Sequence, residues 1–191
     1  GRWLPLNLLP SASSGRRNER VSIMRTKLAV LSAIACSIAW AQPVITPGGT
    51  VNAADYSRAA LTPGAIVSIF GSGLASGESF AQALPLPQSL AGTSVEINAG
   101  GRTIVLPLFA VSPRQINAML PYGISGNAQV RVRTAGGESA ADTIALLDRA
   151  PRFFSVDQSG VGRAILTHPN GDLATRANPV KPGQFAVIYL N

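Results

Sequence analysis

The chain has 191 residues, with 16 lysines and arginines against 9 acids and a formal net charge of +7. Such a charge favours a nucleic-acid or anionic-surface partner, but its distribution argues against one. Six of the cations and one of the acids precede residue 42, so ten cations and eight acids remain, a net charge of +2. The basic character belongs to the N-terminal leader, and we expect no nucleic-acid partner.

The leader has the pattern of a secretory signal peptide. A short basic stretch precedes the apolar residues 28–40, and the small residues Ala39 and Ala41 occupy the −3 and −1 positions before Gln42. This apolar stretch is too short to cross a hydrocarbon core of about 30 Å as a helix. We predict a signal peptide over 24–41, cleaved before Gln42, with no stable membrane span after its removal.

The leader also contains the only cysteine, Cys36. A second interpretation makes Cys36 a lipidation site, although the apolar stretch continues past it. Cleavage before Gln42 leaves a chain without cysteine, and export without disulfides fits a bacterial secreted or cell-envelope protein, periplasmic or at the outer surface. Residues 1–23 are interpreted as upstream read-through or a long n-region.

Short apolar runs separated by glycine, proline, serine and asparagine predict an all-β fold for the rest of the chain. Residues 65–70 (AIVSIF) form an apolar run typical of a strand at the centre of a sheet. Residues 93–98 alternate, so Val95 and Ile97 are expected to face the core and Glu96 the solvent. The pattern is that of a β-sandwich.

Two glycine pairs predict turns between strands. Residues 99–101 are expected to connect the strand ending at residue 98 to a strand over 102–106. Residues 135–137 are expected to lead from a strand over 129–133 toward one over 142–147. Short helical turns are also possible at 55–59 and at 79–83.

The predicted organisation is a linker over 42–50, a β-sandwich over 51–149 and an incomplete second β lobe over 150–191. In the second lobe we expect strands over 162–167 and 184–190, with a turn at 168–172. A segment of this size rarely forms a self-sufficient core. We therefore expect the second lobe to be truncated.

Residues 71–77 (GSGLASG) follow a predicted strand, as phosphate-binding loops do. A dinucleotide-binding loop requires three glycines with the spacing G-x-G-x-x-G at the start of a helix, and here the third glycine is displaced by one position. A Walker loop requires lysine followed by serine or threonine, which are missing. We interpret Gly71 and Gly73 as a strand-ending turn that uses the conformational freedom of glycine.

Catalytic and metal-binding patterns are weak in this sequence. His168 is the only histidine, and it lies in a Pro-Asn-Gly turn. A hydrolase that uses His168 with acids such as Asp157 or Asp172 remains an alternative, although no G-x-S-x-G motif is present. The scattered acids provide neither a zinc nor a calcium ligand set. We expect no enzymatic activity, no cofactor and no metal.

Two other groups of residues could bind a partner. Arg131 and Arg133 point to the same side of one predicted strand, either as an anion-binding stripe or as a solvated face or edge that discourages strand pairing. Exposed aromatic residues could form a glycan-binding surface. Most aromatic residues after position 42 lie at strand positions suited to a core, and Tyr122 is the one most clearly expected on a loop.

Several phrases, taken in order, resemble an uncharacterised C-terminal domain family of acidobacterial, Solibacter-type secreted proteins. They are VNAADY (51–56), PGAIVSIFGSGLA (63–75), LPLPQSLAGTSV (84–95), PLFAVSPRQINAMLPY (107–122), APRFF (150–154) and NPVKPGQFAVIYLN (178–191). The first lobe also resembles the TIG/IPT immunoglobulin-like domain of plexins and some transcription factors. The resemblance implies a β-sandwich and no catalytic residue set, with a Gly-Leu-Gly continuation beyond residue 191.

These observations predict a non-catalytic extracellular or cell-surface module for structure or interaction. Its expected partners are neighbouring domains, other surface proteins or a polysaccharide. A carbohydrate-binding accessory domain is the main alternative, and an extracellular hydrolase using His168 is the other.

Overall fold

The computed structural model describes residues 41–59 and 61–191. The described residues contain β-strands and connecting turns, and no helix among them is long and apolar enough to cross a membrane. The strands are β1 (Val44–Asn52), β2 (Ile66–Ser72), β3 (Ser79–Phe80), β4 (Ser94–Ala99), β5 (Arg102–Val105), β6 (Leu108–Val111), β7 (Gln115–Met119), β8 (Gly126–Thr134), β9 (Gly137–Glu138), β10 (Asp142–Leu146), β11 (Leu166–Thr167) and β12 (Val187–Ile188).

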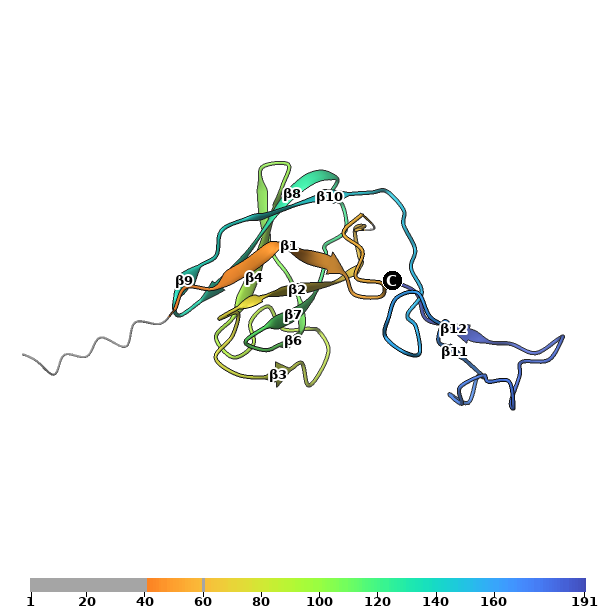
Figure 1. The fold of residues 1–191 in the computed structure, drawn as a ribbon. Helices are drawn as coiled ribbons and strands as arrows, with labels where there is room; N and C mark the ends of the chain where they lie inside the picture. The colour runs from red at the N-terminus through yellow and green to blue at the C-terminus, as the bar shows by residue number, and fades with distance from the viewer. Residues whose placement is uncertain (1–40, 60) are drawn as a thin grey trace, which may run out of the picture. The chain divides into compact units, whose positions relative to one another are not determined.

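Ten of these strands form two antiparallel sheets (Figure 1). The first sheet has the order β1-β2-β7-β6-β3, and the second has the order β10-β8-β4-β5 with β9 paired to β8. The chain crosses between the sheets three times, after β3, after β5 and after β7. The predicted all-β sandwich is confirmed.

The core lies between the two sheets and is aliphatic. Val67 and Ile69 on β2 are fully buried, as are Val95 and Ile97 on β4. Successive side chains of a strand point to opposite faces, so the residues between them point outward. Burying each of these side chains stabilises the fold by about 1.5–3 kcal/mol. The predictions for Val95 and Ile97 are confirmed, and β2 is an interior strand that lies between β1 and β7.

The glycine-rich turn between β4 and β5 is also confirmed. Gly100 and Gly101 have φ of 57° and 78°, and Ala99 pairs with Arg102 across the turn. The turn before β10 is more complex, because the two-residue strand β9 pairs with the end of β8 before the chain continues into β10. A single reversal had been expected there.

Three expectations for the first lobe are wrong. Residues 42–50, expected as a linker, supply most of β1, so the sandwich starts at Val44 instead of residue 51. Residues 79–83 begin with strand β3 rather than a helical turn, and residues 55–59 form a non-helical turn and bend. Pairing with a neighbouring strand outweighs local preference in β1 and β3.

Strand β1 is held from the opposite sheet. Its register against β2 shifts between Ile45 and Thr50, which is a bulge. The buried carboxylate of Asp142 on β10 accepts hydrogen bonds from Thr50 N at 3.0 Å and Gly48 N at 3.3 Å, and it pairs with Arg58 at 3.1 Å. Asp142 thus accepts hydrogen bonds from backbone N–H groups of the bulge, as a neighbouring strand does where pairing is regular.

Residues 150–191 contain only short pairings. Two residues of β11 pair with two of β12, where longer strands over 162–167 and 184–190 had been expected. The turn predicted at 168–172 is confirmed, with His168 N bonded to Asp172 O at 2.9 Å. Turns and short backbone pairings hold this part of the chain together, including bonds between Arg152 and Asn191.

The side chains of Asn191 and Arg152 attach this segment to the sandwich. The Asn191 side chain bonds the backbone N and O of Ile66 at 2.6 and 2.7 Å, and the side chain of Asn52 at 2.7 Å. Arg152 pairs with Asp55 at 2.7 Å. The Asn191 side-chain amide therefore accepts a hydrogen bond from the Ile66 N–H and donates one to the Ile66 carbonyl, as the backbone of a paired strand does.

Candidate functional site

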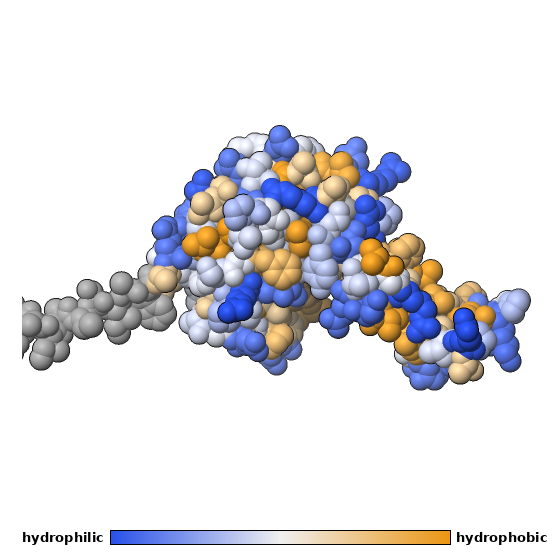
Figure 2. Space-filling view, viewed as in Figure 1, coloured by the Kyte–Doolittle hydropathy of each residue, from blue (hydrophilic) through white to orange (hydrophobic). Residues whose placement is uncertain are grey.

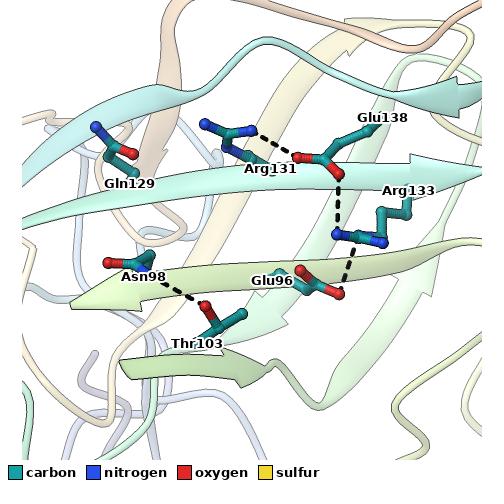
Figure 3. A pocket seen from close by; sticks show the side chains of 7 residues that line it. All are labelled: Glu96, Asn98, Thr103, Gln129, Arg131, Arg133 and Glu138. Carbon is teal, nitrogen blue, oxygen red and sulfur yellow. Dashed lines mark hydrogen bonds and ion pairs between the residues drawn. The ribbon is translucent and has the colours of Figure 1, made fainter. Parts of the chain in front are cut away.

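A polar hollow of about 200 Å³ lies on the outer face of the second sheet (Figure 3). It is formed by outward-pointing residues of β4, β5, β8 and β9, whose alternate residues fill the core. Its lining residues are Glu96, Asn98, Thr103, Gln129, Arg131, Arg133 and Glu138.

The charges in this hollow are paired with one another. Glu138 bonds Arg131 at 2.7 Å and Arg133 at 2.9 Å, and Arg133 also bonds Glu96 at 3.0 Å (Figure 3). The hydrogen bond from Arg131, with the positive charge of Arg133, holds the pKa of Glu138 below its ordinary value. An anion that bound here would have to displace a carboxylate from each arginine.

The two sequence interpretations of Arg131 and Arg133 can now be separated. Both side chains are exposed on a solvated face, as one interpretation expected. The face is not an edge, because β8 lies between β10 and β4. Their ion pairs give an alternating charge network instead of a free anion-binding stripe.

The loop after β2 is a strand-ending turn, as predicted. Gly71 N donates to Arg114 O at 3.0 Å and Leu74 N to Pro113 O at 3.1 Å, so these amides are already used in the fold. Gly73 has a φ of 63°, which favours glycine. Gly71 has a different reason, since a Cβ there would lie 2.1 Å from the carbonyl oxygen of Val44.

A hollow of about 340 Å³ lies beside Gly73. Alanine, glycine, serine and threonine line it, and none of its lining residues is ionisable. A general acid or base would have to come from elsewhere, so this hollow does not have the composition of a catalytic site.

The side chains of the three residues of the hydrolase alternative bond different partners. His168 Nε2 lies 3.2 Å from the backbone oxygen of Asn178, and Asp172 bonds Asn170 at 2.7 Å. Asp157 accepts hydrogen bonds from the hydroxyl and amide of Ser159, which hold the pKa of Asp157 below its ordinary value. Among the described residues, the backbone of His168 bonds Asp172 O, but no hydrogen bond or ion pair joins the His168 side chain to the carboxylate of either acid.

Residues 41–59 and 61–191 contain no group of three or more histidine, cysteine, aspartate or glutamate residues that could hold a metal ion. Of the predicted cleavage residues, Ala39 lies outside the described residues, as does Cys36. Ala41 and Gln42 are described, and the Gln42 side chain donates to Glu138 O.

The aromatic residues lie at the surface, contrary to expectation. Of the nine phenylalanine and tyrosine residues after position 42, none is buried. Six are exposed by 43–85%, namely Tyr56, Phe80, Tyr122, Phe153, Phe185 and Tyr189. The other three, Phe70, Phe109 and Phe154, are half-buried. Tyr122 is exposed beside a turn, as predicted, at 77%.

The aromatic side chains face outward because successive residues of a strand point to opposite faces of the sheet. Val67 and Ile69 take the inward positions of β2, so the adjacent Phe70 must point outward. Phe80 pairs with Ala110, which also lies on the outer side of its sheet. Aromatic rings carry more apolar area than other side chains, and here that area faces solvent.

Comparison with protein-family models gives no match, and comparison with curated protein sequences gives no significant match.

Proposed function

We propose that this chain is an exported, non-catalytic bacterial module whose role is to bind another protein or a neighbouring domain at the cell surface. The observation that carries the proposal is that none of the nine phenylalanine and tyrosine residues after position 42 is buried in the aliphatic core. Aromatic residues are enriched at protein interfaces. The signal-peptide pattern of the leader supports export.

The segment 150–191 supplies the docking surface. Figure 2 shows hydrophobic residues over the part of the chain that includes β11 and β12. Large apolar side chains exposed by 36–91% are Phe153, Val156, Val161, Leu173, Phe185, Val187, Ile188, Tyr189 and Leu190. Large exposed apolar patches mark sites of interaction, and a two-stranded ribbon such as β11–β12 gains stability when another structure packs on it.

The docking surface can be tested with a fluorescent dye that binds exposed apolar patches, such as anilinonaphthalene sulfonate. The full chain is compared with Phe185→Ser/Ile188→Ser, which removes two exposed side chains of the segment. The control is Leu84→Ser, because Leu84 is 83% exposed on the sandwich. We expect the double variant to lose about half of the dye fluorescence or more, and the control to keep it.

Equal fluorescence in all three proteins would contradict this docking surface. The non-catalytic part of the proposal has its own test, which is hydrolysis of ester, peptide and glycoside substrates by the wild type and by His168→Ala. We expect no turnover that depends on His168. Turnover that the wild type shows and His168→Ala lacks would establish the hydrolase alternative.

A further inference from the structure

The outer face of the first sheet carries a second group of aromatic and polar side chains. Phe80 is exposed and Ser68 is buried, while Phe70, Gln115 and Asn117 are half-buried. On β2 and β7, Phe70 lies opposite Gln115 and Ser68 opposite Asn117. The same row continues through Ala110 on β6 to Phe80 on β3. Residues directly opposite each other in a sheet share a face, so these residues form one continuous surface.

Aromatic rings border this surface at both ends. Phe80 is 59% exposed at the β3 edge. At the other end, the ring of Tyr56 lies over Phe70, with centroids 6.0 Å apart and an angle of 53° between the planes. Three strand spacings separate β2 from β3, which is about 14 Å. The face thus presents two aromatic contacts with a row of polar side chains between them.

The backbone of Tyr56 supports a role for its ring. Tyr56 has a φ of 56°, in the left-handed region that a bulky residue adopts only at a cost of about 1–3 kcal/mol. The strain is held by the hydrogen bond from Tyr56 N to Asn52 O at 2.9 Å. The turn thereby places a 43% exposed ring against Phe70.

Amide side chains lie between the two aromatic ends. Gln115 Nε2 donates to Asn117 Oδ1 at 2.9 Å, and the hydroxyl of Ser68 donates to the same oxygen at 3.0 Å. Within the described residues, the Asn117 amide nitrogen and the Gln115 amide oxygen form no hydrogen bond. The fixed amides therefore offer two donor hydrogens and an acceptor to a ligand hydroxyl.

The charge of this face selects against polyanions. Its hollow of about 190 Å³, between β3, β6 and β7, is lined by Phe80, Gln115 and Asn117 together with Glu78, and by no basic residue. Single-stranded nucleic acid also stacks on aromatic rings, but it requires a positively charged groove. A neutral ligand fits this surface better than nucleic acid or an acidic polysaccharide.

We infer that the outer face of the β1-β2-β7-β6-β3 sheet binds an extended neutral polysaccharide. The apolar C–H faces of two sugar rings stack on Phe80 and on the Tyr56–Phe70 pair, where the rings supply apolar contact area. Asn117 and Gln115 hydrogen-bond the hydroxyls of the sugars between them. This site lies on strands other than those of the docking segment 150–191, so it goes beyond the function proposed above.

The test is affinity electrophoresis of the full chain in native gels that contain soluble polysaccharides. The neutral probes are hydroxyethyl cellulose, xylan and galactomannan, and the charged comparisons are polygalacturonate and a single-stranded DNA oligonucleotide. The variant is Phe80→Ala, since the exposed ring can be removed without a core cavity. The matched control is Phe185→Ala, which removes an 85% exposed ring outside this face.

We expect at least one neutral polysaccharide to retard the wild type and Phe185→Ala equally. Phe80→Ala is expected to raise the dissociation constant about tenfold. Three results would overturn the inference: no retardation by any neutral probe, equal loss in both variants, or retardation by the charged probes alone. The dye experiment reports on Phe185 and is unaffected by the outcome at Phe80, so the two proposals fail separately.

Discussion

The sandwich buries its aliphatic residues, whereas the segment 150–191 exposes them. Val67, Ile97 and Ile116 are fully buried between the two sheets, but Val187 and Ile188 on β12 are 42% and 51% exposed. The residue types are the same, so the difference comes from topology. Each sheet of the sandwich has a facing sheet to cover it, while β11 and β12 form a separate two-stranded sheet. An apolar sequence pattern therefore predicts that a strand forms, but it does not predict whether another sheet packs on that strand and buries it.

The largest expected difference is in the free energy of unfolding when one isoleucine in each region is replaced by alanine. Ile97→Ala removes a fully buried side chain from the sandwich core. Such a cavity costs about 2–5 kcal/mol of the free energy of unfolding. Ile188→Ala alters a half-exposed side chain, and we expect less than about 0.5 kcal/mol. Urea denaturation of both variants measures the difference, and equal losses would show that β12 is buried as the core is.

A second comparison uses two glycines near the end of β2. Gly71→Ala places a Cβ 2.1 Å from Val44 O, so β1 and β2 must move apart. We expect a loss of about 2 kcal/mol or more, as in other overpacked sites. The control is Gly77→Ala, where nothing lies within 4 Å of the added Cβ; we expect a change within about 1 kcal/mol. Thermal unfolding of both variants checks this, and a stable Gly71→Ala would contradict the close approach of β1.

The attachment of the C-terminal segment gives a smaller effect. Asn191→Ala removes the side-chain bonds to Ile66 and Asn52, at about 1 kcal/mol each for the segment alone. We expect faster hydrogen exchange at the Ile66 amide, with the global unfolding of the sandwich unchanged. Asn178→Ala is the control, because Asn178 bonds Thr175 and His168 through backbone atoms that the substitution leaves in place. Unchanged exchange at Ile66 in Asn191→Ala would show that the attachment is not formed in solution.

The smallest effect concerns pH and the outer face of the second sheet. The folded pKa of Glu138 lies below its ordinary value of 4.5, mainly because Arg131 donates a hydrogen bond to it. Its contribution to stability is therefore present above the unfolded pKa and is lost as the pH falls through the lower folded value. An NMR titration should place the Glu138 midpoint below that of an ordinary glutamate. Arg131→Ala should raise the midpoint, and an unchanged midpoint would contradict the pairing.

The sequence predicted the strands of the sandwich correctly where inward and outward residues alternate regularly. The alternation around Val95 and Ile97 gave the inward face of β4, and the glycine pair after Ala99 gave the turn into β5. These features depend only on neighbours in the sequence. Parity would also have placed Phe70 outside, since Ile69 is inward, but aromatic character was interpreted as core packing.

Other features depend on residues far apart in the chain. Strand β1 contains Pro47, Gly48 and Gly49, which interrupt a strand pattern, and the carboxylate of Asp142 compensates the resulting bulge from the other sheet. The requirement for glycine at position 71 comes from the carbonyl of Val44, not from its own backbone angle. The amide and aromatic face of the first sheet likewise arises from the pairing of β2, β7, β6 and β3.

We propose that the sandwich is stable on its own and that residues 150–191 gain stability when a partner packs on them. Hydrogen exchange of the full chain without a partner tests this most directly, because it reports local opening along the whole molecule. We predict that amides in β2, β4, β7 and β8 exchange only through global unfolding. Amides in β11 and β12 should exchange at least about a hundredfold faster. Equal protection in the two regions would contradict the account.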